Sequence, residues 1–202
     1  MINVVVFDLD DTLYPEHDYV RSGFTAVNSW IEETYSTIGF YDIASSLLKS
    51  GQSGNIFNQT LDYLEISYDG ELINTLVNIY RRHSPKINLY EDATWAINHF
   101  KNKKKRLAII TDGYLEAQEN KVRSLGLESL FDLIICTDKF GRGNWKPSPM
   151  PYEKIMETFE CEGTDCIYIG DNPRKDFIAA KKNLDGKRYK SIDLTEYTAI
   201  LK

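Results

Sequence analysis

Cysteine is scarce in this sequence, and its three copies follow no recognised pairing pattern. Cys136, Cys161 and Cys166 form neither a disulfide framework nor a paired C-x-x-C metal motif. Cys136 stands in an apolar run typical of a buried strand, and no second ligand pair accompanies Cys161 and Cys166. The pattern therefore argues against a disulfide-stabilised secreted domain and against a structural zinc site.

Long apolar runs and an excess of basic residues are absent as well. No run approaches the length that spans a bilayer, and the first residues lack the order of a signal peptide. The formal net charge of -6 argues against non-specific binding to nucleic acid or to an anionic membrane. We therefore expect a cytoplasmic protein with neither a nucleic-acid nor a membrane partner. The sequence does not indicate its oligomeric state.

The residues that are present suffice for a substantial core and fall into two regions. Hydrophobic residues make up 42% of the 202, which suits one domain, or one domain with an insertion. From residue 15 to about Pro85 the apolar positions recur at helical spacing and predict about four helices, the last capped by Asp69 or a neighbour. No strand pattern interrupts this region, so it reads as a helical insertion.

Strand and helix patterns alternate in the second region. Strands are predicted at 106–111, 131–137 and 166–170, and helices at 93–101, 116–125, 150–159 and 176–183. This alternation predicts right-handed crossovers and a doubly wound parallel sheet, which the buried strand Val4–Phe7 would join. The expected fold is thus α/β, with a core from residues 1–14 and 86–202 and an inserted all-helical domain at 15–85.

Two carboxylates follow the first strand directly. Strand side chains alternate, so Asp8 and Asp10 would point the same way beyond the carboxyl end, where open α/β sheets bind ligands. Carboxylates held this close repel unless a proton or a cation joins them, and Mg²⁺ prefers such oxygen ligands. The alternative is an acidic turn without a ligand. Asp11 turns the other way and is expected to be a turn residue.

Polar residues also follow the later predicted strands. Thr111, Asp112 and Gly113 would form an anion cradle, although such a turn can also be a simple helix cap. Lys146 precedes a rigid Pro-Ser-Pro segment, which would fix its ammonium group unless it is only a surface lysine. Asp171 can supply a third oxygen to the same cation, while Asp176 would cap a helix or orient its neighbours.

The ordered set Asp8-x-Asp10-x-Thr12, Thr111, Lys146 and Gly170-Asp171-x4-Asp176 resembles the four motifs of the haloacid dehalogenase-like (HAD) hydrolase superfamily. The helical region resembles the C1-type cap of subfamily I. The resemblance implies a Rossmann-like core and a magnesium-dependent phosphatase that hydrolyses a small phosphorylated metabolite, such as a sugar phosphate or a nucleotide.

The resemblance also implies individual roles. Asp8 would attack phosphorus and form an aspartyl-phosphate, and Asp10 would move protons. Thr111, Lys146 and the turn at Asp112 and Gly113 would bind the phosphate. Mg²⁺ would be held by Asp8, Asp171 and the backbone carbonyl of Asp10, with Asp176 in support. Family members often carry Asn where this chain has Asp112, whose extra negative charge is harmless if only its N-H faces the phosphate.

Two other functions remain open at this point. One is a non-catalytic or regulatory phosphate-binding module, and the other is a phosphomutase on the same scaffold. A helical insertion and a second acid at Asp10 favour an enzyme over a receiver-like module. Six residues near the ends of the helical region are candidates for substrate contact: Tyr14, His17, Arg21, Arg81, Arg82 and His83. The natural substrate cannot be read from the sequence.

Overall fold

The computed structural model describes residues 2–172, 174–176, 178 and 190–193, and the chain divides into two compact units. One, here called the α/β unit, comprises Met1–Glu16 and Asn88–Lys202. The other, the helical unit, comprises His17–Ile87. The helical unit is thus an insertion in the sequence of the α/β unit.

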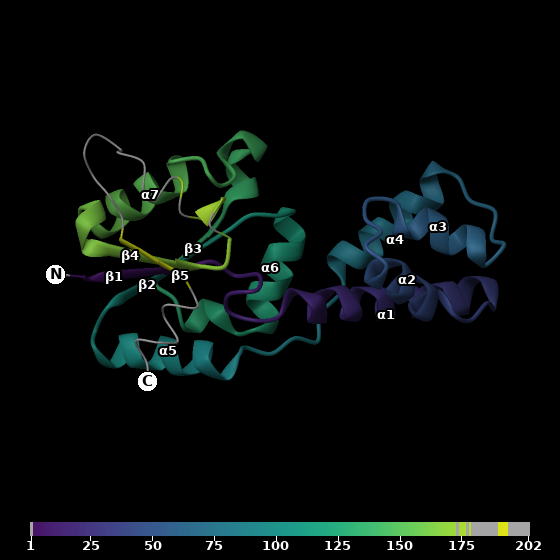
Figure 1. Ribbon diagram of the computed structural model, residues 1–202, viewed down its shortest axis with the longest axis horizontal. Coiled ribbons are helices and arrows are strands. Elements are labelled where there is room, and N and C mark those ends of the chain that lie inside the picture. The colour runs from purple at the N-terminus through teal and green to yellow at the C-terminus, as the bar shows by residue number, and fades with distance from the viewer. Residues whose placement is uncertain (1, 173, 177, 179–189, 194–202) are drawn as a thin grey trace. The chain divides into compact units, whose positions relative to one another are not determined.

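The α/β unit is built on a five-stranded parallel sheet of order β3-β2-β1-β4-β5 (Figure 1). The predicted doubly wound α/β fold is therefore confirmed. The strands are β1 (Val4–Phe7), β2 (Arg106–Thr111), β3 (Leu133–Cys136), β4 (Cys166–Gly170) and β5 (Lys190–Asp193). The helices of this unit are α5 (Glu91–Asn102), α6 (Leu115–Ser124) and α7 (Met150–Phe159). Short 3-10 turns lie at Leu127–Ser129, Thr137–Phe140, Arg142–Asn144 and Gly163–Asp165.

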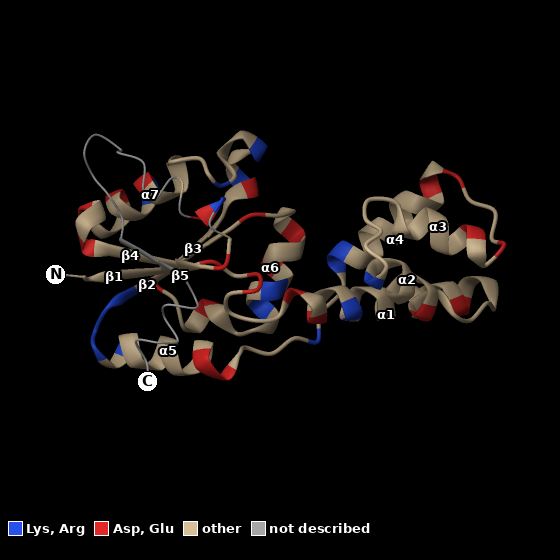
Figure 2. Ribbon diagram, in the orientation of Figure 1, with Lys and Arg blue, Asp and Glu red and all other residues tan. Residues whose placement is uncertain are grey.

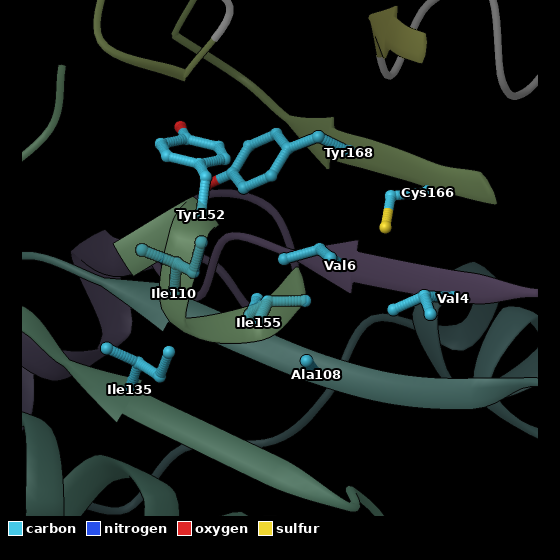
Figure 3. Packing of buried hydrophobic residues seen from close by; sticks show 9 residues of the cluster. All are labelled: Val4, Val6, Ala108, Ile110, Ile135, Tyr152, Ile155, Cys166 and Tyr168. Carbon is cyan, nitrogen blue, oxygen red and sulfur yellow. The ribbon is translucent and has the colours of Figure 1, made fainter. Parts of the chain in front are cut away.

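Both faces of the sheet are covered, which explains why its central strands are apolar throughout. On one face, side chains of β1 to β4 pack against Tyr152 and Ile155 of α7 (Figure 3). On the other face, the ring of Phe7 meets Phe100 of α5 and Phe131 edge-on, at centroid distances of 6.4 and 5.8 Å. Successive residues of β1 thus serve opposite layers of the core.

The strand order places a topological switch point beside β1. The chain runs outward from β1 through β2 to β3, and then crosses back to β4 on the other side of β1. Right-handed crossovers put α5 and α6 on one face and α7 on the other. The loops after β1 and β4 consequently diverge, and this divergence opens a crevice at the carboxyl edge of the sheet.

The helical unit contains four helices, α1 (Glu16–Tyr35), α2 (Phe40–Lys49), α3 (Ile56–Tyr63) and α4 (Gly70–Arg82), with Glu16 itself counted in the α/β unit. Its core draws on all four helices and includes the fully buried Ile31, Phe40, Leu61 and Leu76. Asp69 caps α4 as predicted, because its Oδ1 accepts hydrogen bonds from the backbone of Glu71 at 3.0 Å and Leu72 at 2.9 Å.

Some boundaries differ from those predicted. β3 is shorter than 131–137, since Phe131 packs on Phe7 before the strand begins and Thr137 starts a 3-10 turn. The short strand β5 was not predicted, because its sequence is polar. Most of the predicted helix 176–183 lies outside the described residues. Within the described part of the chain, no helix has the length and apolar character needed to cross a bilayer.

Candidate active site

The carboxyl edge of the sheet gathers the acids that the sequence pointed to. Phe7 pairs in register with Ile169, and the Asp8 N-H donates to the Ile169 carbonyl at 2.9 Å. Acidic residues, red in Figure 2, are concentrated on the loops at this edge. A cavity of about 170 Å³ opens there, with seven carboxylates and two lysines in its lining: Asp8, Asp10, Asp11, Glu16, Asp112, Lys146, Asp171, Asn172, Lys175 and Asp176.

Lys146 is the buried cation of this cavity. Its ammonium Nζ lies 2.6 Å from Asp8 Oδ1, 2.8 Å from Asp176 Oδ1 and 3.2 Å from the Tyr168 hydroxyl. Burial alone would lower the pKa of Lys146, but the two carboxylates outweigh burial and raise that pKa above its usual value. Lys146 is therefore a fixed positive charge between two acids, not a surface lysine.

Asp176 connects the loop after β4 to Lys146. Its side chain has 0% exposure, and its Oδ2 accepts a hydrogen bond from the Asn172 N-H at 2.9 Å. A Cβ on Gly170 would lie 2.5 Å from the same oxygen, so only glycine fits there while Asp176 keeps its place. Asp176 therefore orients Lys146 and the loop, a role that the sequence left open beside helix capping.

Three carboxylates lie close enough to share a cation. One oxygen from each of Asp8, Asp171 and Asp176 lies within 4.8 Å of the others. Burial raises the pKa of Asp8 to about 7 against the opposing effect of Lys146, and burial and Asp176 also raise the pKa of Asp171. The three carboxylates repel one another, and a divalent cation that prefers oxygen ligands would relieve this repulsion. This acidic cluster is therefore able to bind a metal ion.

The Asp10 side chain points to a different set of partners. Its Oδ1 accepts hydrogen bonds from the Tyr14 hydroxyl and from Lys121 Nζ, the latter at 2.7 Å. Its Oδ2 accepts from Gln118 Nε2 at 2.9 Å. Gln118 and Lys121 were not predicted from the sequence. The available signal was two polar residues one turn apart on the helix that follows the Thr111 turn.

The turn after β2 lies beside the same acids. Thr111 is buried, and its Oγ1 has no hydrogen-bond partner among the described residues. The Asp112 carboxylate accepts from Thr137 Oγ1 at 2.7 Å and from the Lys146 N-H at 3.1 Å. Gly113 has φ +133°, and a Cβ there would lie 2.4 Å from Gln118 Nε2.

The candidate substrate-contacting residues have varied surroundings. Tyr14 is fully buried and bonded to Asp10. Arg21 and His83 line a cavity of about 560 Å³ within the helical unit, together with Asp18 and Lys86. The His17 side chain is exposed, and its Nε2 lies 3.3 Å from Asp18 Oδ1. Asp11, in contrast, accepts a hydrogen bond from the Glu16 N-H at the start of α1, at 2.8 Å, and has φ 53°.

The sequence of this chain matches a known protein family. The family model described as haloacid dehalogenase-like hydrolase matches residues 5–184, which is most of the chain. The chain belongs to the haloacid dehalogenase-like hydrolases, so the predicted family is confirmed and the protein is an enzyme of that class.

Two relatives of similar sequence are a phosphatase and a pyrophosphatase. The chain is 29% identical to the glyceraldehyde 3-phosphate phosphatase of Methanocaldococcus jannaschii, over 98% of this chain and 91% of that protein. It is 28% identical to the pyrophosphatase PpaX of Halalkalibacterium halodurans, over 85% and 75%.

A solved structure of a 2-haloacid dehalogenase from Pseudomonas syringae also resembles the chain. Its TM-score is 0.61 at 21% identity, covering 100% of this chain and 98% of that one. At this identity the likeness shows the fold alone, and the choice of reaction depends on the residues of the site.

Proposed function

We propose that this protein is a magnesium-dependent phosphatase that hydrolyses a small phosphomonoester through an aspartyl-phosphate on Asp8. The observation that carries the proposal is the joint contact of Lys146 with Asp8 and Asp176, in a cluster where oxygens of Asp8, Asp171 and Asp176 lie within 4.8 Å of one another. The buried Thr111 hydroxyl, which has no hydrogen-bond partner among the described residues, supports the same proposal. The phosphatase names of the relatives support the same reaction class.

Each residue has a task in the proposed first displacement. An Asp8 carboxylate oxygen bonds to phosphorus while the bond from phosphorus to the leaving oxygen breaks, and Asp10 gives that oxygen its proton. Lys146 offsets charge on the transferring group, and Thr111 Oγ1 donates a hydrogen bond to one of its oxygens.

The second displacement regenerates the enzyme. A water oxygen bonds to phosphorus, the bond between phosphorus and Asp8 breaks, and Asp10 takes a proton from that water. Inorganic phosphate then leaves. A second acid at Asp10 distinguishes this site from one for dehalogenation, in which no leaving oxygen needs a proton.

Mg²⁺ is the cation that we assign to the acidic cluster. Asp8 and Asp171 would hold it with the backbone carbonyl of Asp10, since the Asp10 carboxylate is committed to Tyr14, Gln118 and Lys121. Asp176 would support the site through Lys146 and the Asn172 N-H. A bound Mg²⁺ would neutralise charge on the phosphoryl group.

We further propose that the helical unit, predicted as the cap at residues 15–85, selects the substrate. None of the residues that line the acidic cavity belongs to the helical unit, which has a separate cavity lined by Arg21 and His83. A cap that closes over the bound phosphate ester would exclude water and contact the leaving group.

Phosphate release from a panel of phosphomonoesters, with Mg²⁺ and with a chelator, tests the reaction. We expect turnover only with the metal, and a loss of about 10³-fold or more in Asp8→Asn, because the nucleophile is removed. Asp42→Asn, the same change on an exposed position of α2, should keep full activity.

Three outcomes would contradict the proposal. Turnover in the presence of chelator, or full activity of Asp8→Asn, would exclude the mechanism. Inactivity on every ester, with Mg²⁺ and phosphate still bound, would favour a phosphate-binding module. Mass spectrometry of acid-quenched enzyme should detect phosphate on Asp8.

A further inference from the structure

Gln118 and Lys121 hold the side chain of Asp10 from one face of α6. Both residues are only 3% exposed, and they are one helical turn apart, so their polar ends meet the same carboxylate. Lys121 Nζ reaches Oδ1 at 2.7 Å, and Gln118 Nε2 reaches Oδ2 at 2.9 Å. Together with the Tyr14 hydroxyl on Oδ1, these donors engage both oxygens and define the plane of the carboxylate.

Burial of a lysine and a glutamine side chain is unfavourable in free energy unless their polar ends are hydrogen-bonded or paired with charge. A buried ammonium loses its hydration and needs a charged partner, and Asp10 is the partner that the structure places at 2.7 Å. Gln118 Oε1 is buried without a hydrogen-bond partner among the described residues. An unsatisfied buried acceptor is unfavourable, and here it accompanies an amide N-H₂ group that donates to two acceptors, Asp10 Oδ2 and the Asp112 carbonyl.

Gln118 also ties Asp10 to the phosphate-binding turn. Its Nε2 lies 2.5 Å from the Asp112 carbonyl as well as 2.9 Å from Asp10 Oδ2. Both partners are acceptors, so the orientation of the amide is fixed. Gly113 leaves room for this amide, because a Cβ there would overlap it. The turn after β2 and the acid after β1 are thus held at one separation.

We propose that Lys121 and Gln118 are positioning residues for the proton transfers of Asp10. They fix the Asp10 carboxyl group where it lines the cavity, from which it would give a proton to the leaving oxygen and later take one from the attacking water. This inference rests on the proposed phosphatase function. It extends that function to two residues outside the four motifs.

The leaving group of the substrate provides the test. A phosphate ester with an alkyl leaving group needs a proton from Asp10 as its bond to phosphorus breaks, whereas a nitrophenyl leaving group departs without one. Misplacing Asp10 should therefore slow the alkyl ester more. We would measure kcat/KM of the Mg²⁺-loaded wild type and of Lys121→Met and Gln118→Met on one ester of each kind.

The expected result is a selective loss. Lys121→Met should lower kcat/KM on the alkyl ester about tenfold more than on the nitrophenyl ester, a fraction of the 10²–10⁴-fold that proton transfer typically contributes. Gln118→Met should show a smaller loss with the same selectivity. Lys139→Met is the matched control. It removes an exposed lysine outside α6 whose Nζ lies 2.9 Å from Oε1 of Glu119 in α6.

Equal losses on the two esters, or wild-type kinetics in both variants, would overturn the inference. Asp10→Asn separates this failure from failure of the function itself. If the wild type hydrolyses both esters and Asp10→Asn is selective while the Lys121 and Gln118 variants are not, only the inference is wrong. If the wild type hydrolyses neither, the proposed function is wrong. Should Lys121→Met fail to fold, Gln118→Met, which removes no charge, decides the question.

Discussion

Asp112 shows how much the role of one residue depends on where its side chain points. Placed beside a phosphate, its carboxylate would repel the substrate. In the structure the carboxylate accepts hydrogen bonds from Thr137 and from the Lys146 N-H. Its negative charge thus braces the segment that carries Lys146, and the sequence could not distinguish the two orientations.

This bracing predicts the effect of replacing Asp112. Asp112→Ala leaves the Lys146 N-H without its acceptor and should lower the free energy of unfolding by about 1–3 kcal/mol. Asp112→Asn retains an acceptor oxygen and should cost less. Urea unfolding of the two variants beside wild type measures both values. Equal stability of Asp112→Ala and wild type would show that the hydrogen bonds contribute nothing.

Single elements of the chain were the most predictable level. The predicted bounds of β2, α7 and β4 agree with the structure, because a Gly or Pro or a change of period marks their ends. The polar strand β5 could not be predicted, since it takes its conformation from backbone pairing with β4.

The N-cap of α4 yields a prediction at this level. Asp69→Ala removes the acceptor for two backbone N-H groups and should destabilise the helix by about 1 kcal/mol. Amide hydrogen exchange over 70–82 should then become about fivefold faster. Asp62→Ala, on an exposed position of α3, is the control. Unchanged exchange in Asp69→Ala would mean that the cap adds no stability.

In the whole molecule, the helical unit is inserted between two segments of the α/β unit that contact each other. The Tyr90 N-H donates to the Leu13 carbonyl at 2.9 Å, so the segments before and after the insertion are hydrogen-bonded to each other. The residues that line the acidic cavity all belong to the α/β unit, and the core of the helical unit uses its own side chains.

We therefore predict that the α/β unit folds when a short Gly-Ser linker replaces residues 17–87. Mg²⁺ should still raise its melting temperature. Binding adds up to about 2.7 kcal/mol to the free energy of unfolding at a hundredfold excess of Mg²⁺ over Kd. Turnover of a nitrophenyl ester should persist while discrimination among phosphate esters is lost. Calorimetry and phosphate release measure these effects. A melting temperature that ignores Mg²⁺, while that of the full chain responds, would place essential ligands in the helical unit.

The fold class and most of the acidic site were predictable from the amino-acid sequence. Buried parallel strands have distinctive apolar runs, and polar groups that follow their carboxyl ends converge on one edge of the sheet. Asp8, Lys146 and Asp171 could therefore be brought together without coordinates.

Tertiary structure alone decided which partner each polar group takes. Hydrogen bonds act over about 3 Å and depend on side-chain direction, which neither spacing nor periodicity records. Only the folded chain brings Gln118 and Lys121 of α6 to Asp10. In the same way, only the fold brings Asp176, which follows β4, to Lys146.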